Sequence, residues 1–520
     1  MKLNYRRTIL VGFAFFLISA FWQAYDATIP VILTNKFGMN QTWSGVIMAL
    51  DNILAVFMLP IFGALSDKCV GKKTGKRTPF ITVGTIIAAI ALVCMSFVDN
   101  AQLNRLSDVS AVNDRDALSA IYDQQADKTL KTPDGVEFTL KEVFPDKEDF
   151  KDITCEIELA SGEIITNPDY TNYVVPARQA CAADATNEDP TLLVFFIVLL
   201  LAVLIAMAIF RSPAVALMPD VTIKPLRSKA NAVINLMGTA GGIIVLVLGI
   251  VFATGSIKHN MMSYTLYYGV IAMLMLGALG IFRLTVREPE WSRQMQEDSR
   301  RFGIDESAED ENSGDRRLTR SERRSLLLIL ASIALWYIGY NAITSKYSLY
   351  ASSVLNMDYN TTLLLAQAAA IVAYIPAGMV ASKIGRKKTI LAGVVMLTSA
   401  FAVASFLRAG SSAVLMNVLF CLAGIGWATI NVNSFPMVVE MCSGANIGKY
   451  TGYYYTASMA AQIVTPVLSG ALMDATGKMT ILFPYAAVFA GLAFVTMYYV
   501  RHGDAKPEAK KGLEALDTDD

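Results

Sequence analysis

The sequence predicts an all-α membrane protein with twelve transmembrane helices in two pseudo-symmetric six-helix bundles. Of its 520 residues, 54% are hydrophobic and only 17% are charged, whereas about a quarter of the residues of a typical soluble domain are charged. The charges gather between apolar runs of about 20 residues, the length that crosses a bilayer core. In addition, a basic loop that begins at Gly63 has a weaker copy 315 residues later, at Gly378, which predicts two related halves.

Each apolar run is expected to be a helix, because a backbone in lipid must satisfy its own hydrogen bonds. No alternating ten-residue pattern of membrane β-strands is present. The N-terminal run is longer than the core of a signal peptide, so we expect it to be retained as the first helix. The predicted spans are residues 8–34, 41–66, 78–98, 191–218, 229–253, 262–285, 325–350, 361–382, 388–407, 413–438, 446–472 and 480–501.

The segments between the spans predict the domain organisation. We expect residues 1–98 and 191–285 to form the N-terminal bundle and residues 325–501 the C-terminal bundle. Residues 286–324 are highly charged and almost free of aliphatic side chains, which predicts a cytoplasmic linker. Residues 502–520 resemble them and predict a cytoplasmic tail. Basic residues concentrate in alternate short loops, so we expect both termini to be cytoplasmic and the chain to span the cell membrane several times.

Residues 99–190 interrupt this pattern and are expected to form an extracytoplasmic insert. The insert contains 20 acidic and eight basic residues, a net charge of −12, and two strand-like stretches. We expect Cys155 and Cys181 to form a disulfide there, because extracytoplasmic compartments permit oxidation; two free thiols are the alternative. A solvated decoration is a simpler interpretation of the insert than a role in capturing substrate.

The loop after the second predicted span combines Gly63, Asp67 and a group of basic residues. A glycine allows a neighbouring helix to approach closely, and an acid can pair with basic side chains to lock the helix ends together in one state. Anchoring of the loop by basic residues is the simpler interpretation, but it does not explain the copy at Gly378. The predicted gating residues are Gly63, Asp67, Lys73, Arg77, Arg211, Asp220, Arg227, Gly378 and Arg386.

This loop resembles the signature loop of the major facilitator superfamily. The stretch "VREPEW" is similar to the end of the first half in that family, and "SDKCVGKKTGKRTPF" and residues 211–242 resemble the sucrose-type and glycoside–pentoside–hexuronide sugar symporters. The resemblance covers nearly all the chain outside residues 99–190 and the linker. It implies a carrier whose two bundles open alternately to each side. Ser382 stands where the family pattern has an acid, so an ion pair is not implied in the second copy.

Two acids lie within predicted spans, where charged side chains are rare and mark functional sites by default. Asp26 lies 19 residues after Arg7 and Asp51 lies 16 residues before Asp67, which places them about 28 Å and about 24 Å along antiparallel helices. They therefore lie at similar depth. A carboxyl group sheltered from water binds a proton more tightly, and more so beside a second carboxyl. We expect Asp26, Asp51 or both to couple proton movement to transport; hydrated acids near one surface are the alternative.

Polar and aromatic side chains within the spans are the candidate substrate contacts. Sugars offer apolar faces to aromatic rings and hydroxyl groups to amides, and an amide without a partner is costly in lipid. Packing or anchoring at the membrane interface is the alternative for the aromatic residues. The predicted contacts are Trp22, Gln23, Tyr25, Asn52, Trp336, Tyr340, Asn341, Gln367, Asn417 and Gln462.

The motifs exclude several function classes. "GKKTGKR" departs from the spacing of an ATP-binding P-loop, and no nucleophile–base pair or metal-ligand set is visible in the sequence. We therefore expect no enzymatic activity, no cofactor and no nucleic-acid partner. The expected function is secondary active uptake of a sugar or glycoside, such as a disaccharide, by a monomer in a lipid bilayer, coupled to a cation that we expect to be a proton. Efflux of drugs or metabolites, and a membrane receptor that does not transport, are the alternatives.

Overall fold

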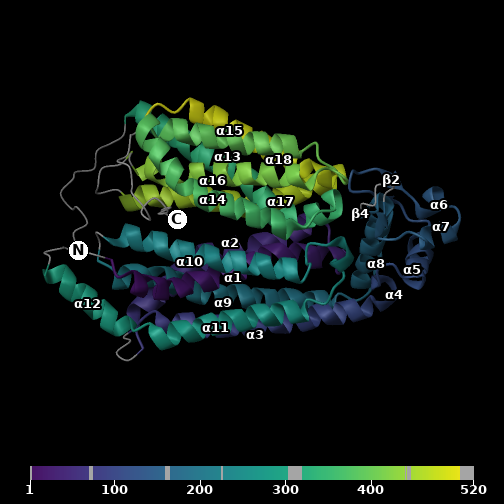
Figure 1. Ribbon diagram of the computed structural model, residues 1–520, viewed down its shortest axis with the longest axis horizontal. Helices are drawn as coiled ribbons and strands as arrows, with labels where there is room; N and C mark the ends of the chain where they lie inside the picture. Colours follow the sequence, from purple (N-terminus) through teal and green to yellow (C-terminus); the bar gives the residue numbers. More distant parts are fainter. Residues whose placement is uncertain are drawn as a thin grey trace.

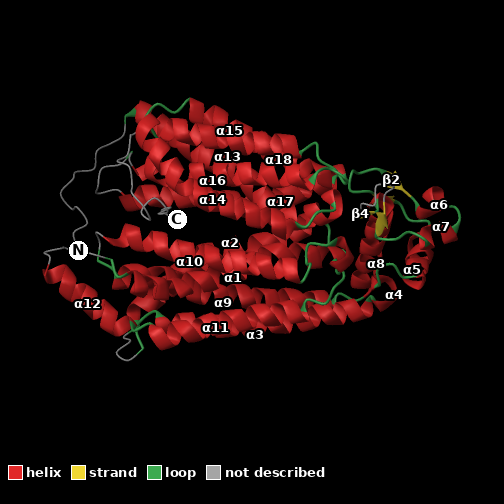
Figure 2. Ribbon diagram, in the orientation of Figure 1, coloured by secondary structure: helices red, strands yellow, loops and turns green. Residues whose placement is uncertain are grey.

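The computed structural model describes residues 3–69, 74–158, 164–223, 226–301, 319–439, 441 and 447–503. Within these residues the protein is almost entirely helical (Figure 2). Among the described residues, eleven helices are long and apolar enough to cross a membrane, and α14 (Tyr359–Ile384) is a further long helix beside them. The predicted fold class is therefore confirmed.

Two bundles lie side by side along the long axis of the molecule (Figure 1). The N-terminal bundle contains α1 (Tyr5–Asn35), α2 (Gln41–Lys68), α3 (Thr78–Arg105), α9 (Thr191–Val221), α10 (Arg227–Val251) and α11 (Thr265–Thr285). The C-terminal bundle contains α13 (Arg320–Tyr350), α14, α15 (Arg386–Ala404), α16 (Ala413–Val439), α17 (Ile447–Thr476) and α18 (Leu482–Tyr498). Each bundle has its own hydrophobic core, centred on side chains such as Phe210 and Tyr268 in the first and Trp336 and Phe483 in the second.

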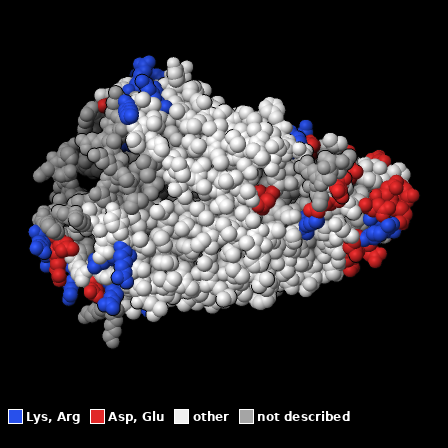
Figure 3. All heavy atoms as spheres, viewed as in Figure 1, with Lys and Arg blue, Asp and Glu red and all other residues white. Residues whose placement is uncertain are grey.

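We name the two ends of the molecule by what they carry. The terminal face is where α1 begins and α18 ends, and the insert face is where α3 ends and α9 begins (Figure 1). Lys and Arg side chains gather toward the terminal face, Asp and Glu side chains gather over the insert, and the visible surface between them is almost uncharged (Figure 3). An apolar band of this kind is the surface that a bilayer requires.

Local sequence sets the helix ends. Asn40 caps α2 by accepting a hydrogen bond from the Trp43 N–H at 2.9 Å, and Thr319 begins α13 with a capping box that includes Glu322. Such side chains satisfy N–H groups that have no partner within the helix. The ends of these helices therefore follow from short polar motifs between the apolar runs.

The third helix is longer than predicted, because α3 continues to Arg105 rather than ending near residue 98. Its extension contains Asp99, whose carboxylate accepts hydrogen bonds from Lys36 Nζ at 2.7 and 2.8 Å, both side chains being fully buried. Gln102 Nε2 also donates to the Lys36 carbonyl at 2.8 Å. Asp99 and Gln102, which end the apolar run in the sequence, thus find polar partners inside the bundle, and α3 continues past them.

The insert is a small α/β unit at the insert face (Figure 1). Its antiparallel hairpins pair Leu130 with Phe138 and Glu156 with Thr166. Its elements are α4 (Ser107–Ser110), α5 (Arg115–Gln125), β1 (Leu130–Lys131), β2 (Glu137–Phe138), α6 (Leu140–Val143), α7 (Lys147–Lys151), β3 (Glu156–Glu158), β4 (Ile164–Thr166), the π-helix η1 (Tyr170–Val174) and α8 (Val175–Glu188). The predicted strand-like stretches therefore form strands, although most of the insert is helical.

The expected disulfide between Cys155 and Cys181 is not formed, because both residues are free thiols. Both are buried in the core of the insert, where they pack as small apolar side chains. The Cys155 N–H donates to Asn113 Oδ1 at 2.6 Å. Burial raises the pKa of both thiols to about 11, so that they are protonated at neutral pH.

The predicted linker is partly helical, since α12 (Glu288–Arg301) forms within it. Trp291 is buried against the core of the N-terminal bundle, and the Arg7 guanidinium lies 4.9 Å from the centre of its ring. Arg7 also donates to Gln294 at 2.6 Å. The first part of this charged segment therefore packs on the N-terminal bundle, although its scarcity of aliphatic side chains predicted a linker.

Candidate functional site

Two adjoining cavities lie between the bundles. The larger has a volume of about 540 Å³ and is lined by α1, α9, α10, α13, α14, α15 and α16. The smaller, of about 190 Å³, is lined by α1, α2, α9, α13 and α17. Trp22, Asp26, Arg211 and Thr344 line both. Together they form one central site with walls from both bundles.

Ionisable side chains from three helices face this site. Asp26 and Arg211 line both cavities, and Asp51 lines the smaller one. Asp51 Oδ1 accepts a hydrogen bond from Asn52 Nδ2 at 2.7 Å, and the Arg211 guanidinium lies 5.7 Å from the centre of the Trp22 ring. The structure thus brings together the two acids singled out in the sequence. It also places Arg211 in the cavity beside them rather than at the membrane surface.

A pair of glutamines crosses the larger cavity. Gln367 of α14 donates from Nε2 to Gln23 Oε1 of α1 at 2.6 Å, which joins the two bundles at their centre. Asn341 and Gln462 line the smaller cavity, and Asn341 Nδ2 has no hydrogen-bond partner among the described residues. Unpaired amide groups in a cavity are available to a polar ligand.

An aromatic platform forms another part of the wall. Tyr340 of α13 stacks on Trp427 of α16 with ring centres 3.7 Å apart and planes inclined by 4°, and both residues line the larger cavity. Trp427 was not identified from the sequence, because a single tryptophan in an apolar run has the same signal as a packing residue.

Three predicted substrate contacts line neither cavity. Trp336 is fully buried in the core of the C-terminal bundle. Tyr25 is buried on α1, where its ring packs against Phe21 and Trp22. Asn417 lies on α16 near the insert face, away from the lining of both cavities. The structure does not bring these three side chains into the central site, because helical spacing alone does not distinguish a face toward a cavity from a face toward the core.

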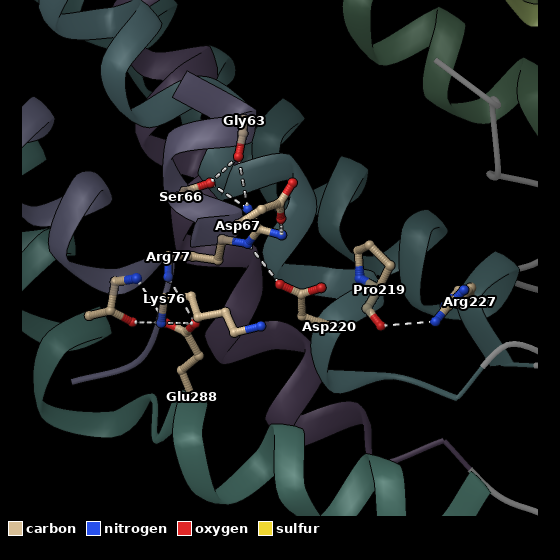
Figure 4. A network of polar contacts seen from close by, with 10 residues as sticks. Gly63, Ser66, Asp67, Lys76, Arg77, Pro219, Asp220, Arg227 and Glu288 are labelled. Carbon is tan, nitrogen blue, oxygen red and sulfur yellow. Dashed lines mark hydrogen bonds and ion pairs between the residues drawn. The ribbon is translucent and has the colours of Figure 1, made fainter. Parts of the chain in front are cut away.

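The predicted gating loop forms an ion-pair cluster at the terminal face (Figure 4). Arg77 donates from Nη2 to Asp67 Oδ1 at 2.5 Å and from Nε to Asp220 Oδ2 at 2.7 Å. Its Nη1 also donates to Ser66 Oγ. The cluster joins the ends of α2, α3 and α9. The Asp220 side chain is 33% exposed and that of Asp67 is 64% exposed, so the pair with Asp220 is better shielded from water.

Glu288 completes this cluster from the start of α12. Its carboxylate accepts hydrogen bonds from the N–H groups of Lys76, Arg77 and Thr78 at 2.6–2.8 Å, and from Thr78 Oγ1 at 2.6 Å. These donors lie at the N-terminus of α3, where N–H groups lack helical partners and a negative charge is favourable. Gly75 has a φ of +91°, and a Cβ there would collide with the Glu288 carboxylate, so this turn requires glycine. Glu288 belongs to the stretch "VREPEW", for which the sequence indicated a resemblance to a family pattern but no role for the carboxylate.

The two signature glycines differ in their surroundings. A Cβ at Gly63 would lie 2.9 Å from Ser212 Oγ of α9, as expected for a close helix contact. At Gly378 the nearest such atom among the described residues, Val432 Cγ1, would lie at 4.0 Å, so the close approach seen at Gly63 is not repeated there.

The other predicted gating residues have separate environments. Arg227 donates to the carbonyls of Thr222 and Pro219 at 3.1 and 3.2 Å, near the end of α9 (Figure 4). Arg386 begins α15 at the terminal face. Lys73 lies outside the described residues. These hydrogen bonds of Arg227 therefore lie within its own bundle.

At the insert face, α2 and α17 are joined by polar contacts that the sequence analysis missed. Asp474 of α17 accepts hydrogen bonds from the Gln41 and Thr42 N–H groups at 3.0 and 2.7 Å, and also from Thr42 Oγ1. Lys346 of α13 is buried and donates to the Gln41 carbonyl at 2.7 Å. The C-terminal bundle thus caps the start of a helix in the N-terminal bundle. Lys346 was visible as a charged residue within a predicted span, which is a signal of function.

Backbone contacts close the same seam. A Cβ at Gly45 would collide with the Pro466 carbonyl, and one at Gly470 would collide with the Gln41 carbonyl. Small residues permit this kind of close helix packing. We call these contacts, together with those of Asp474 and Lys346, the insert-face gate. These contacts hold α2 against α13 and α17 in this structure.

A second seam between α10 and α14 lies at the same face. The Tyr359 hydroxyl donates to Thr254 Oγ1 at 2.9 Å, and Asn360 Nδ2 donates to the same oxygen at 3.0 Å. The bundles are therefore held together on both sides of the central site at its insert-face end.

Comparisons with known proteins agree with this architecture. A family profile described as Major Facilitator Superfamily matches residues 179–374 and 359–518, and one described as MFS/sugar transport protein matches residues 10–103. The MFS-type transporter ppzB of Metarhizium rileyi (strain RCEF 4871) is 28% identical over 135 residues, which span 26% of this chain and 27% of that protein.

Solved structures show the same fold at low identity. The inward-open xylose transporter XylE from E. coli has a TM-score of 0.57 at 14% identity, with 99% of each chain covered. A mutant of the nucleoside transporter NupG has a TM-score of 0.55 at 14% identity, with 95% of this chain and 98% of that chain covered. With two six-helix bundles around a central cavity and a family profile that matches more than half of its length, this chain belongs to the Major Facilitator Superfamily of membrane transporters.

Proposed function

We propose that the protein is a proton-coupled transporter that imports a sugar or glycoside by alternating access. The observation that carries this proposal is the position of Asp26 and Asp51 in the same central site as a stacked aromatic pair and a glutamine bridge. Groups that can bind a proton and groups that can bind a polyhydroxylated molecule thus share one space between the bundles.

The lining of the larger cavity suits a sugar. Its volume of about 540 Å³ lies within the range of roughly 300–1,000 Å³ that is usual for small-molecule sites. Tyr340 and Trp427 offer a flat apolar face, and Gln23 and Gln367 offer amides to hydroxyl groups. The match of residues 10–103 to a sugar-transport profile and the similarity in fold to a xylose transporter support this substrate class.

Asp26 and Asp51 are proposed to carry the coupling proton. A bare carboxylate is costly within a membrane, and moving the bundles around two such groups is easier when one is neutral. Arg211 in the same site can compensate the charge of Asp51 when that proton is released. Binding and release of a proton therefore change the net charge of the site through which the substrate passes.

The orientation follows from the charges at the two faces. We propose that the terminal face is cytoplasmic, because the predicted inner loops and the charge distribution in Figure 3 place Lys and Arg there. The insert then lies outside the cell, and a monomer in the cell membrane suffices, since the walls of the central site come from one chain.

Counterflow in proteoliposomes tests the proposed function. Vesicles that contain the protein are loaded with one unlabelled sugar from a panel of mono- and disaccharides, and uptake of the radiolabelled sugar is measured with and without a pH gradient. We expect counterflow of at least one sugar, and accumulation when the outside is acidic. Asn417→Ala, outside both cavities, is the matched control and should behave as wild type. No counterflow with any sugar would contradict the substrate class, and accumulation only with an opposite gradient would favour efflux.

A further inference from the structure

The insert is built as part of the N-terminal bundle. Its ends continue directly into α3 and α9. Its hydrophobic core, which includes Leu118 and Phe150, continues into Ile257 and Met261 of the loop between α10 and α11. The insert therefore packs on a loop of the N-terminal bundle through apolar side chains, and we expect it to move with that bundle.

Polar contacts strengthen this attachment. Lys258 of the same loop pairs with Glu156 of β3, and Gln179 of α8 donates to Asn35 Oδ1 at the end of α1 at 2.7 Å. Each contact joins the insert to the bundle from which it emerges.

The insert also reaches across to the C-terminal bundle. The turn between β1 and β2, residues 132–135, lies against the segment that follows α17. The Met479 N–H donates to the Pro133 carbonyl at 2.9 Å, and Asp134 Oδ1 lies 3.4 Å from Arg408 Nε in an ion pair. Residues 132–135 thus touch two separate loops of the opposite bundle.

A second bridge lies nearby, between the insert and the end of α13. Thr171 Oγ1 of η1 donates to Asn356 Oδ1 at 2.9 Å. These bridging contacts are polar and partly exposed, whereas the insert packs on its own bundle through apolar side chains. Contacts of this kind can break and form again without exposing apolar surface.

The bridge lies directly over the insert-face gate. A pocket of about 400 Å³ is lined by Gln41 and Asp474 of the gate and by Lys131, Thr132 and Gln179 of the insert. The insert therefore forms part of the wall of the pocket beside the gate.

We propose that residues 132–135 are a latch that holds the insert-face gate closed and must detach from the C-terminal bundle each time this face opens. The inference rests on the proposed alternating access, in which the bundles separate at the insert face. Because the insert moves with the N-terminal bundle, that separation breaks the contacts of Pro133 and Asp134. The insert is then a working part of the gate rather than a decoration.

Reversible cross-linking tests the latch. In a variant that lacks the native cysteines, Pro133→Cys and Met479→Cys are joined by a short bifunctional thiol reagent that reduction removes. The backbone hydrogen bond brings their Cα atoms close enough for such a bridge. Glu156→Cys and Lys258→Cys, which join the insert to its own bundle, form the matched control.

The expected result is at least a ten-fold loss of sugar counterflow in the cross-linked latch pair, full recovery on reduction, and no loss in the control pair. Full counterflow with the latch cross-linked would overturn the latch while leaving the proposed transport intact. If the reduced variants and the wild type show no counterflow at all, the proposed function fails rather than the latch. The latch is then tested by a measurement that needs no substrate.

That measurement uses spin labels at Trp43→Cys and Ala475→Cys, two exposed positions at the insert-face ends of α2 and α17. Asp134→Lys, which repels Arg408, should increase the population with a long distance between the labels. Asp123→Lys is the control, because Asp123 pairs with Lys147 inside the insert. An unchanged distance distribution in Asp134→Lys would overturn the latch irrespective of substrate.

Discussion

Gln367 donates a hydrogen bond of 2.6 Å to Gln23 across the boundary between the two bundles. The two side chains lie in the wall of the central cavity, one on α14 and one on α1. A substrate hydroxyl that takes the place of either amide would exchange a bond between bundles for a bond to the ligand. Binding of a ligand at this pair would therefore weaken a contact that holds the two bundles together.

Replacing Gln23 or Gln367 by leucine should weaken substrate binding. A hydrogen bond contributes a net of about 0.5–1.5 kcal/mol, which corresponds to roughly a 2- to 12-fold change in affinity. We expect KM for counterflow to rise by this factor with little change in the maximal rate. Asn417→Leu serves as the control, because Asn417 lines neither cavity. An unchanged KM in both glutamine variants would remove the pair from the substrate site.

The aromatic platform and the aromatic core should respond differently to truncation. Trp427→Leu removes the ring that stacks on Tyr340, and the loss of about 0.5–1.5 kcal/mol should weaken sugar binding by roughly 2- to 12-fold. Trp336→Leu, in the core, should instead lower thermal stability, since truncation of a large buried side chain costs about 3–5 kcal/mol.

Thermal unfolding and equilibrium sugar binding, measured on both variants in detergent, separate the two effects. If folded Trp336→Leu lost as much sugar binding as Trp427→Leu, the assignment of Trp336 to the core would be contradicted.

The Glu288 carboxylate should stabilise the terminal face. Glu288→Gln keeps the shape but removes the charge that faces four donors, and we expect a loss of about 1–3 kcal/mol. Glu290→Gln is the matched control, because Glu290 is more exposed and lies 3.6 Å from its partner Arg287. Its effect should stay within about 0.5 kcal/mol. Equal melting temperatures for the two variants would show that the cap contributes nothing.

The thiols of the insert should react slowly below their raised pKa. Burial moves the pKa of Cys155 and Cys181 to about 11. The protonated form is therefore favoured in the folded state, and this contribution to stability is present at neutral pH and lost as the pH rises from about 9 toward 11.

Alkylation of folded protein at pH 8, followed by mass spectrometry, measures this. We expect Cys155 and Cys181 to be modified far more slowly than after unfolding, with rates that increase as the pH approaches 11. Rapid modification of both at pH 8, or their recovery as a disulfide, would contradict the structure.

Much of the fold could be predicted from the sequence, because membrane spans are long and uniform signals. Asp26 and Asp51 were found for the same reason, since a charge in an apolar run is rare. The length of α3 could not be predicted, because Asp99 is stabilised by Lys36, which lies 63 residues away. Only the packed structure reveals such pairing.

Contacts between the bundles were beyond sequence reasoning. Asp474 and Gln41 are 433 residues apart, and neither has a local motif that indicates the other. The aromatic residues show a subtler limit. Trp336 and Tyr340 lie one turn apart on α13, yet one belongs to the core and the other to the cavity. The spacing of residues shows that they lie on the same side of a helix, but only the packing of the other helices shows whether each side chain contacts the core or a cavity.

The most direct test of proton coupling through Asp26 and Asp51 is the proton flux that accompanies the sugar. A sugar that shows counterflow is added to weakly buffered proteoliposomes without a pH gradient, and the external pH is recorded. Uptake should make the medium alkaline in the wild type, whereas Asp26→Asn, Asp51→Asn or both should retain counterflow and lose the pH change. Sugar uptake without any pH change in the wild type, or an unchanged signal in both variants, would contradict this account.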